Sequence, residues 1–292
     1  GYMDQRRTGI ALMVDQAYEV ALGGEAEAAA VLEKDFLDDQ QNKNGGKYDG
    51  LYEDWARPVV LPIEDYGELR GNLEDLQGRF NLNNLVNANG TINQETLAQF
   101  TNLLERLQID NRWAGIIADW IDADNNPNYP DGAEDSIYSL RTPAYLTANR
   151  PIMNTSELLA LVDGSGKPFG MDNYRRLEPF VAALPINTPL NVCTAAPEII
   201  DSLTSPGNTE FSTGNGRANL EENRKSMCFP KLTDIRATFQ NDPVFKSMMQ
   251  KHGDYLSETT QYFRANILVT LGTTQLAMYS VLQRTGNGKV HV

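Results

Sequence analysis

The sequence predicts an α+β fold in which both ends of the chain build one unit and a mostly helical domain is inserted between them. Three observations carry this prediction. Helical periodicity runs from about Gln5 to Phe36, apolar and polar residues alternate strictly from Phe263 to Leu271, and short helical patterns fill much of the chain between these segments.

The N-terminal segment is expected to form one helix from about Gln5 to Phe36, ended by Asn44-Gly45-Gly46. A helix of roughly thirty residues exceeds the usual globular length and suggests a spine. Apolar residues recur along it at helical spacing, at Ile10, Val14, Ala17, Tyr18 and Ala21.

Strands are expected on both sides of the helical block. Two short ones lie at Arg57–Ile63 and Glu68–Asn72, joined by the turn Asp65-Tyr66-Gly67. After the alternating segment that ends at Leu271, Gly272-Thr273 turns the chain. The sequence then returns as strands at Gln275–Leu282 and Lys289–Val292.

The middle of the chain reads as short helices with recognisable caps. Asn93 and Asn111 each precede a helical pattern, and Asn154 with Glu157 has capping-box spacing. Further helices are predicted around Tyr174, Leu177, Phe180 and Val181, from Thr194 to about Leu203, at Thr233–Phe239, and at Pro243–Gly253 behind the cap Asp242. Asn81 and Asn83 are interpreted as local backbone caps.

These elements define the predicted domain boundaries. Residues 1–90 and 230–292 form the helix-and-sheet domain, and residues 91–229 form the inserted helical domain. Within the insert, residues 204–227 are rich in Gly, Asn, Ser, Thr and Glu and are expected to be a flexible segment.

Composition excludes several classes of function. The 292-residue chain carries a net charge of −14, which disfavours binding to a phosphate backbone. It contains neither a P-loop nor a dinucleotide glycine motif, and no run of about 18 apolar residues that would span a membrane.

The chain has two cysteines, Cys193 and Cys228. They are either two buried thiols or one disulfide, and we favour the disulfide because it ties together the ends of the Gly- and Asn-rich segment. Closing that loop would add roughly 3–4 kcal/mol of stability. A disulfide in turn implies an oxidising compartment such as a periplasm.

Residues 117–135 concentrate acidic side chains at the end of an apolar helix. Carboxylates this close repel one another unless a cation neutralises them or the loop stays in water. The start matches an EF-hand loop at Asp122, Asp124 and Asn126, but Pro127 and Ala133 break the match. The segment is therefore either a calcium loop of another kind or a solvated acidic turn. The candidate ligands are Asp119, Asp122, Asp124, Asn126, Asp131, Glu134 and Asp135.

No catalytic constellation is apparent, so no enzyme is expected. A glycosidase pair would need carboxylates on opposing walls of a cleft, whereas these acids share one short loop. His252 and His291 are not part of a recognisable motif with a serine or cysteine.

Taken together, the chain resembles the minor pseudopilin K family (general secretion pathway protein K) of bacterial type II secretion systems. Segments that carry this resemblance occur in order along nearly the whole chain. They are Glu74-Asp75-Leu76-Gln77-Gly78-Arg79-Phe80-Asn81-Leu82-Asn83, Asp119-Trp120-Ile121-Asp122-x-Asp124, Gly132-Ala133-Glu134-Asp135-x-x-Tyr138, Ala148-Asn149-Arg150-Pro151, Leu184-Pro185, Pro189-Leu190-Asn191-Val192, and Gln261-Tyr262-Phe263 to Tyr279-Ser280-Val281-Leu282-Gln283-Arg284.

The resemblance implies a pilin-like fold, with a long N-terminal helix on an antiparallel sheet and a large inserted helical domain. It also implies one or two calcium ions in the acidic loop, with Asp122, Asp124, Glu134 and Asp135 as the main ligands. Cys193 departs from the family pattern, so a disulfide would belong to a subset of members.

Family membership further implies a non-enzymatic subunit at the tip of the periplasmic pseudopilus. It would initiate and cap the filament in complex with the minor pseudopilins I and J, and an N-terminal helix outside this sequence would anchor the full-length protein in the inner membrane. The expected partner surface is the spine helix at Ile10, Met13, Val14, Ala17, Tyr18 and Ala21. The alternative is a periplasmic calcium-dependent module that binds exported substrate or a cell-wall ligand.

Overall fold

The computed structural model describes residues 1–41, 47–64, 67–122, 152 and 154–292. The chain divides into two compact units. The sheet unit comprises residues 1–76, 224–228 and 258–292, and the helical unit comprises residues 77–223 and 229–257. The predicted α+β class with an inserted helical domain is therefore confirmed.

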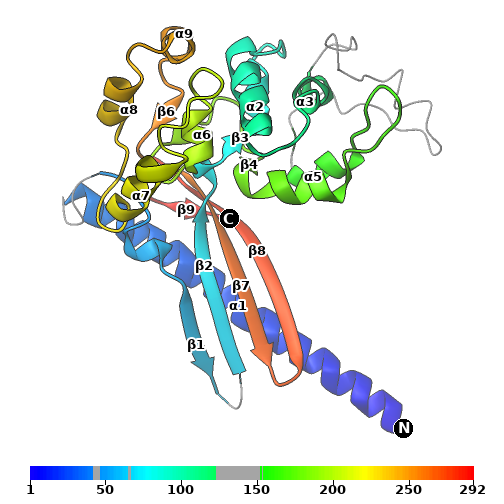
Figure 1. Cartoon of the computed structure of the whole chain (residues 1–292). Helices are drawn as coiled ribbons and strands as arrows, with labels where there is room; N and C mark the ends of the chain where they lie inside the picture. The colour runs from blue at the N-terminus through cyan, green and yellow to red at the C-terminus, as the bar shows by residue number, and fades with distance from the viewer. Residues whose placement is uncertain (42–46, 65–66, 123–151, 153) are drawn as a thin grey trace. The chain divides into compact units, whose positions relative to one another are not determined.

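The sheet unit is a long helix packed on an antiparallel sheet. Helix α1 (Tyr2–Gln40) lies against one face of the sheet (Figure 1). Neighbouring strands of the sheet are all antiparallel. Their order is β1 (Val59–Ile63), β2 (Gly67–Asp75), β7 (Tyr262–Leu271), β8 (Thr274–Arg284) and β9 (Val290–His291). Strand β2 pairs directly with β7, so the helical unit is inserted in the sequence between two neighbouring strands of this sheet.

The core of the sheet unit follows from the alternation of β7. Phe263, Ala265, Ile267 and Val269 are buried and pack with Ala17, Ala21 and Leu32 of α1. The β7–β8 hairpin closes as predicted at Gly272, whose φ of 59° lies in the left-handed region that glycine enters without steric cost. No helix among the described residues is both long and apolar enough to cross a bilayer.

The helical unit is built from short elements around its own apolar core. Its α-helices are α2 (Gln94–Arg106), α3 (Trp113–Ile121), α5 (Gly170–Leu177), α6 (Pro197–Asp201), α7 (Gly214–Asn223), α8 (Leu232–Thr238) and α9 (Pro243–Lys251). Short 3₁₀ turns include η3 (Leu82–Leu85), η4 (Thr155–Ala160) and η5 (Glu178–Phe180). Two-residue parallel pairs join β3 (Phe80–Asn81) to β4 (Val181–Ala182) and β5 (Leu190–Asn191) to β6 (Leu256–Ser257).

Most predicted caps are confirmed. The side chain of Asn93 accepts a hydrogen bond from Thr96 N, and that of Asp242 accepts one from Phe245 N. Asn154 and Glu157 form the expected capping box, although the helix that it starts is 3₁₀. The Asn111 cap was wrong: α3 begins after Arg112, while Asn111 donates to Glu105 Oε1.

Two predicted boundaries also need correction. The helical unit begins at Gln77 rather than near residue 91 and extends to Ser257, because residues such as Phe80, Leu85, Phe239 and Phe245 pack into its core. The prediction of a flexible segment at 204–227 was wrong as well, since that stretch contains α7, which the buried Leu220 holds to the core.

A further correction concerns the helix predicted around Tyr174, Leu177, Phe180 and Val181. It ends as an α-helix at Leu177, continues as the 3₁₀ turn η5, and gives way to β4 at Val181. Pro179 at the start of η5 cannot donate the backbone hydrogen bond that would continue the α-helix.

Candidate functional site

The predicted partner-binding residues of α1 differ in their exposure to solvent. Ala17 and Ala21 are fully buried in the sheet unit's own core, so their side chains are not available to a partner. Val14 and Tyr18, one helical turn apart, are 40% and 49% exposed. Met13 is half-buried, and the Ile10 side chain lies outside the described residues. We call the pair Val14 and Tyr18 the outer α1 surface.

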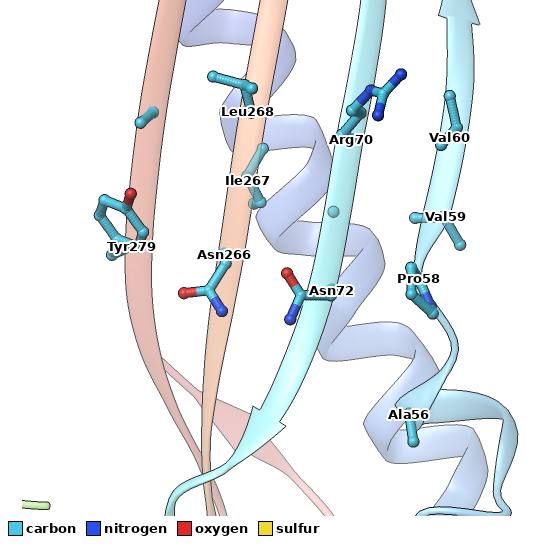
Figure 2. Close-up of a pocket in the computed structure, with 12 residues that line it drawn as sticks. Ala56, Pro58, Val59, Val60, Arg70, Asn72, Asn266, Ile267, Leu268 and Tyr279 are labelled. Carbon is cyan, nitrogen blue, oxygen red and sulfur yellow. The ribbon is translucent and has the colours of Figure 1, made fainter. Parts of the chain in front are cut away.

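The face of the sheet turned away from α1 is a second exposed surface. Residues Asn72, Asn266 and Tyr279 form one cross-strand row on it, and Tyr279 is 70% exposed (Figure 2). On the edge strand β1, Val60 shares this face and is 55% exposed, whereas the neighbouring Val59 points to the opposite face and is 48% exposed. Exposed apolar side chains gathered on one element are typical of protein contact surfaces.

Only part of the predicted calcium set falls in the described residues. Asp119 is fully buried on the last turn of α3, and Asp122, which caps that helix, is 4% exposed. The other five candidate ligands lie outside the described residues; they are Asp124, Asn126, Asp131, Glu134 and Asp135.

Cys193 and Cys228 are both buried, and they form the favoured disulfide.

The asparagines after β2 do more than cap locally. Asn81 accepts from Asn83 N, as predicted, and also from Leu184 N at 3.0 Å. Asn83 donates to the carbonyls of Ile152 and Leu184, both at 2.8 Å, and accepts from Ile152 N. These buried amides therefore fasten segments that are 69 to 103 residues apart in sequence.

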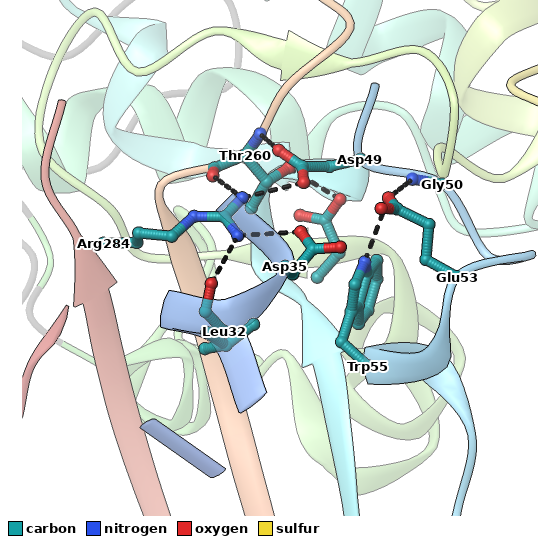
Figure 3. Close-up of polar contacts among 9 residues, drawn as sticks. Leu32, Asp35, Asp49, Gly50, Glu53, Trp55, Thr260 and Arg284 are labelled. Atoms are coloured by element: carbon teal, nitrogen blue, oxygen red, sulfur yellow. Dashed lines mark hydrogen bonds and ion pairs between the residues drawn. The ribbon is translucent and has the colours of Figure 1, made fainter. Parts of the chain in front are cut away.

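Sequence reasoning missed a buried acidic cluster in the sheet unit. It consists of Asp35 and Asp39 on α1 together with Asp49 and Glu53, all 7% exposed or less. Arg284, at the end of β8, pairs with two of the four: Nη1 lies 2.9 Å from Asp35 Oδ2, and Nη2 lies 2.7 Å from Asp49 Oδ1 (Figure 3).

Neighbouring groups fix the orientation of the cluster. Asp49 Oδ2 accepts from Thr260 N at 2.7 Å, and Glu53 Oε1 accepts from Gly50 N and Trp55 Nε1. Burial raises the pKa of Asp39 and of Glu53, and neighbouring carboxylates raise both further. The one sequence signal that could have indicated this site is spacing, because Asp35 and Asp39 continue the helical stripe of Ala21, Ala28 and Leu32 that faces the core of the sheet unit.

The fold places the chain among pilin-like proteins, in which a long N-terminal helix packs on an antiparallel sheet. It is similar to the GspK structure solved in the GspK-GspI-GspJ complex from the type 2 secretion system of enterotoxigenic Escherichia coli. The TM-score is 0.77 at 24% identity, over 98% of this chain and 96% of that one.

Sequence comparison goes further than the fold. Residues 78–186 match the family described as type II secretion system (T2SS), protein K. The type II secretion system protein K of Pseudomonas aeruginosa is 36% identical over 96% of this chain and 80% of its own length. That of Aeromonas hydrophila is 31% identical over 99% and 86%. The chain therefore belongs to the type II secretion system protein K family.

Proposed function

We propose that this chain is a minor pseudopilin that assembles with the pseudopilins I and J at the tip of a periplasmic pseudopilus. There it would help to initiate the filament and cap it, without catalysing a reaction. Family membership is the observation that carries this proposal. The solved relative of the same fold was crystallised as a GspK-GspI-GspJ complex, which supports the choice of partners.

The exposed apolar residues of the sheet unit suit such an assembly. Tyr18 and Val14 present apolar area on a long helix. Aromatic residues are enriched among the residues that contribute most of the binding energy of protein interfaces. We assign the outer α1 surface to this contact and leave Ala17 and Ala21 to the core of the sheet unit.

Co-purification tests the assembly. The chain, mixed with the periplasmic domains of pseudopilins I and J from the same organism, should elute as one species whose mass by light scattering matches one copy of each. Separate elution of the chain under conditions where I and J bind each other would contradict the proposal and favour a module that binds another ligand.

We also propose that the acidic loop after α3 binds calcium. Asp122, Asp124, Glu134 and Asp135 would be its main ligands, joined by Asp119, Asn126 and Asp131. The buried positions of Asp119 and Asp122 support this, because the C-terminal end of a helix already carries partial negative charge and burial of carboxylates there is costly. Hard oxygen ligands of this kind suit Ca²⁺.

Chelation tests the calcium loop. Because a ligand that binds only the folded state adds stability by mass action, a chelator should lower the thermal midpoint, and excess Ca²⁺ should restore it. Asp124→Ala should reproduce the chelated state, whereas Asp110→Asn, at a half-exposed acid before α3, should leave the calcium response intact. A melting curve that chelator and calcium leave unchanged would contradict this proposal.

A further inference from the structure

We propose that Asp35, Asp39, Asp49 and Glu53 of the sheet unit form a divalent cation site that takes Ca²⁺, separate from the acidic loop of the helical unit. Each of these side chains offers a carboxylate oxygen, and the four oxygens all lie within 4.8 Å of one another. They come from two segments, the last turns of α1 and the stretch before the 3₁₀ turn η1 (Asp54–Ala56).

The charge balance of the cluster calls for a cation. Among the described residues, the cation that pairs with these four buried carboxylates is the guanidinium of Arg284, so their full ionisation would leave a large excess of negative charge out of water. The end of α1 makes this worse, because a helix C-terminus is itself partially negative and the last turn of α1 carries no basic residue. One divalent ion would offset most of this excess.

Two oxygens give independent support. Oδ1 of Asp39 and Oε2 of Glu53 are buried without a hydrogen-bond partner among the described residues, although their side chains are only 7% and 3% exposed. Both side chains belong to the group whose four carboxylate oxygens lie within 4.8 Å of one another. Ionised carboxylates are acceptors only and cannot satisfy one another, whereas a metal ion satisfies several at once.

The geometry suits calcium. Calcium–oxygen distances of about 2.4 Å place opposite ligands about 4.8 Å apart, and the four carboxylate oxygens lie within that distance of one another. Hydrogen bonds also hold the carboxylates that would bind the metal in place. Asp49 accepts from Thr260 N, Glu53 accepts from Gly50 N and Trp55 Nε1, and Asp35 accepts from Arg284.

Calorimetric titration of Ca²⁺ tests the site and separates it from the loop. Wild type should bind one more Ca²⁺ per chain, or bind it at least tenfold more tightly, than Glu53→Gln and Asp39→Asn. Asp54→Asn is the matched control, since Asp54 is the neighbouring acid but its side chain is 84% exposed. In an Asp124→Ala background, which removes the proposed loop site, the same difference should persist.

Each result decides between the two sites. If Glu53→Gln and Asp39→Asn bind Ca²⁺ like wild type in both backgrounds, the cluster holds protons rather than a metal and this inference is overturned. That result would leave the loop proposal untouched, and loss of binding in Asp124→Ala alone would support the loop while still overturning the cluster.

Tb³⁺ luminescence covers the case in which the acidic substitutions prevent folding. Trp55 Nε1 lies 3.2 Å from Glu53 Oε1, and the other two tryptophans, Trp113 and Trp120, belong to the helical unit. In the Asp124→Ala background, tryptophan-sensitised Tb³⁺ emission should appear and should be largely lost on Trp55→Phe. Emission that Trp55→Phe leaves unchanged would overturn the cluster site.

Discussion

Arg284 and Asp49 form a buried ion pair in the sheet unit, with 2.7 Å between Nη2 and Oδ1. Both side chains are 4% exposed or less, and the same guanidinium donates to the carbonyls of Leu32 and Thr260. Its carbon also lies 5.1 Å from the centre of the Phe263 ring. One side chain at the end of β8 thus ties together α1, the stretch before η1 and the start of β7.

Removal of that guanidinium should destabilise the sheet unit strongly. Arg284→Met leaves Asp35 and Asp49 buried without their counter-charge, so we expect a loss of about 3–5 kcal/mol in the free energy of unfolding by urea. Arg264→Met is the matched control, because the Arg264–Glu74 pair on neighbouring strands is partly exposed and should cost less than about 1 kcal/mol. Equal losses in the two variants would contradict this account.

The local elements were predictable because short-range chemistry determines them. The strict alternation of β7 and the glycine at position 272 specify a hairpin. Asn93 and Asp242 cap their helices through bonds to residues three positions away, so these caps do not depend on where the helices pack. In contrast, nothing close in sequence to Asn83 indicates its bonds to Ile152 and Leu184. Such contacts form only once the chain has folded.

The candidate sites, like the fold, were only partly predictable from the sequence. An apolar spine on α1 was expected, but sequence alone could not tell that Ala17 and Ala21 would face the sheet while Tyr18 stays exposed. The acidic cluster was missed because Asp35 and Asp39 look like solvated helix residues. Their burial depends on Arg284, which lies 249 residues from Asp35 in the sequence.

The amide of Asn83 should be important for the stability of the helical unit. Asn83→Ala leaves backbone groups of Ile152 and Leu184 without a partner in a buried site, so we expect a loss of about 3 kcal/mol in the free energy of unfolding. Asn89→Ala, in an exposed turn nearby, should cost less than about 1 kcal/mol. Urea denaturation of both variants makes the comparison, and a neutral Asn83→Ala would show that these bonds contribute little.

Asp242 should make stability depend on pH at the acid end. Burial alone would raise the pKa of its carboxyl group, but hydrogen bonds from the backbone of Phe245 and Ser205 outweigh burial and lower the pKa. A carboxylate with a lowered folded-state pKa contributes stability that is fully present above its unfolded pKa of about 3.9. That contribution is lost as pH falls through the folded value.

Asp242→Ala should therefore cost about 1 kcal/mol at pH 7 and less near pH 2, because the contribution of the carboxylate declines once pH falls below its unfolded pKa. Urea unfolding of wild type and variant at both pH values measures this difference. A cost that is the same at the two pH values would contradict the assignment of the lowered pKa to these hydrogen bonds.

The affinity of the chain for a preformed complex of pseudopilins I and J tests the central claim most directly. Biolayer interferometry should show saturable binding of one chain per I–J pair. Tyr18→Glu should weaken it at least tenfold, because it places a charge in the buried part of the contact. Glu19→Gln, at the exposed neighbouring position, should bind like wild type. Absence of binding by wild type, or equal affinity of wild type and Tyr18→Glu, would contradict assembly through the outer α1 surface.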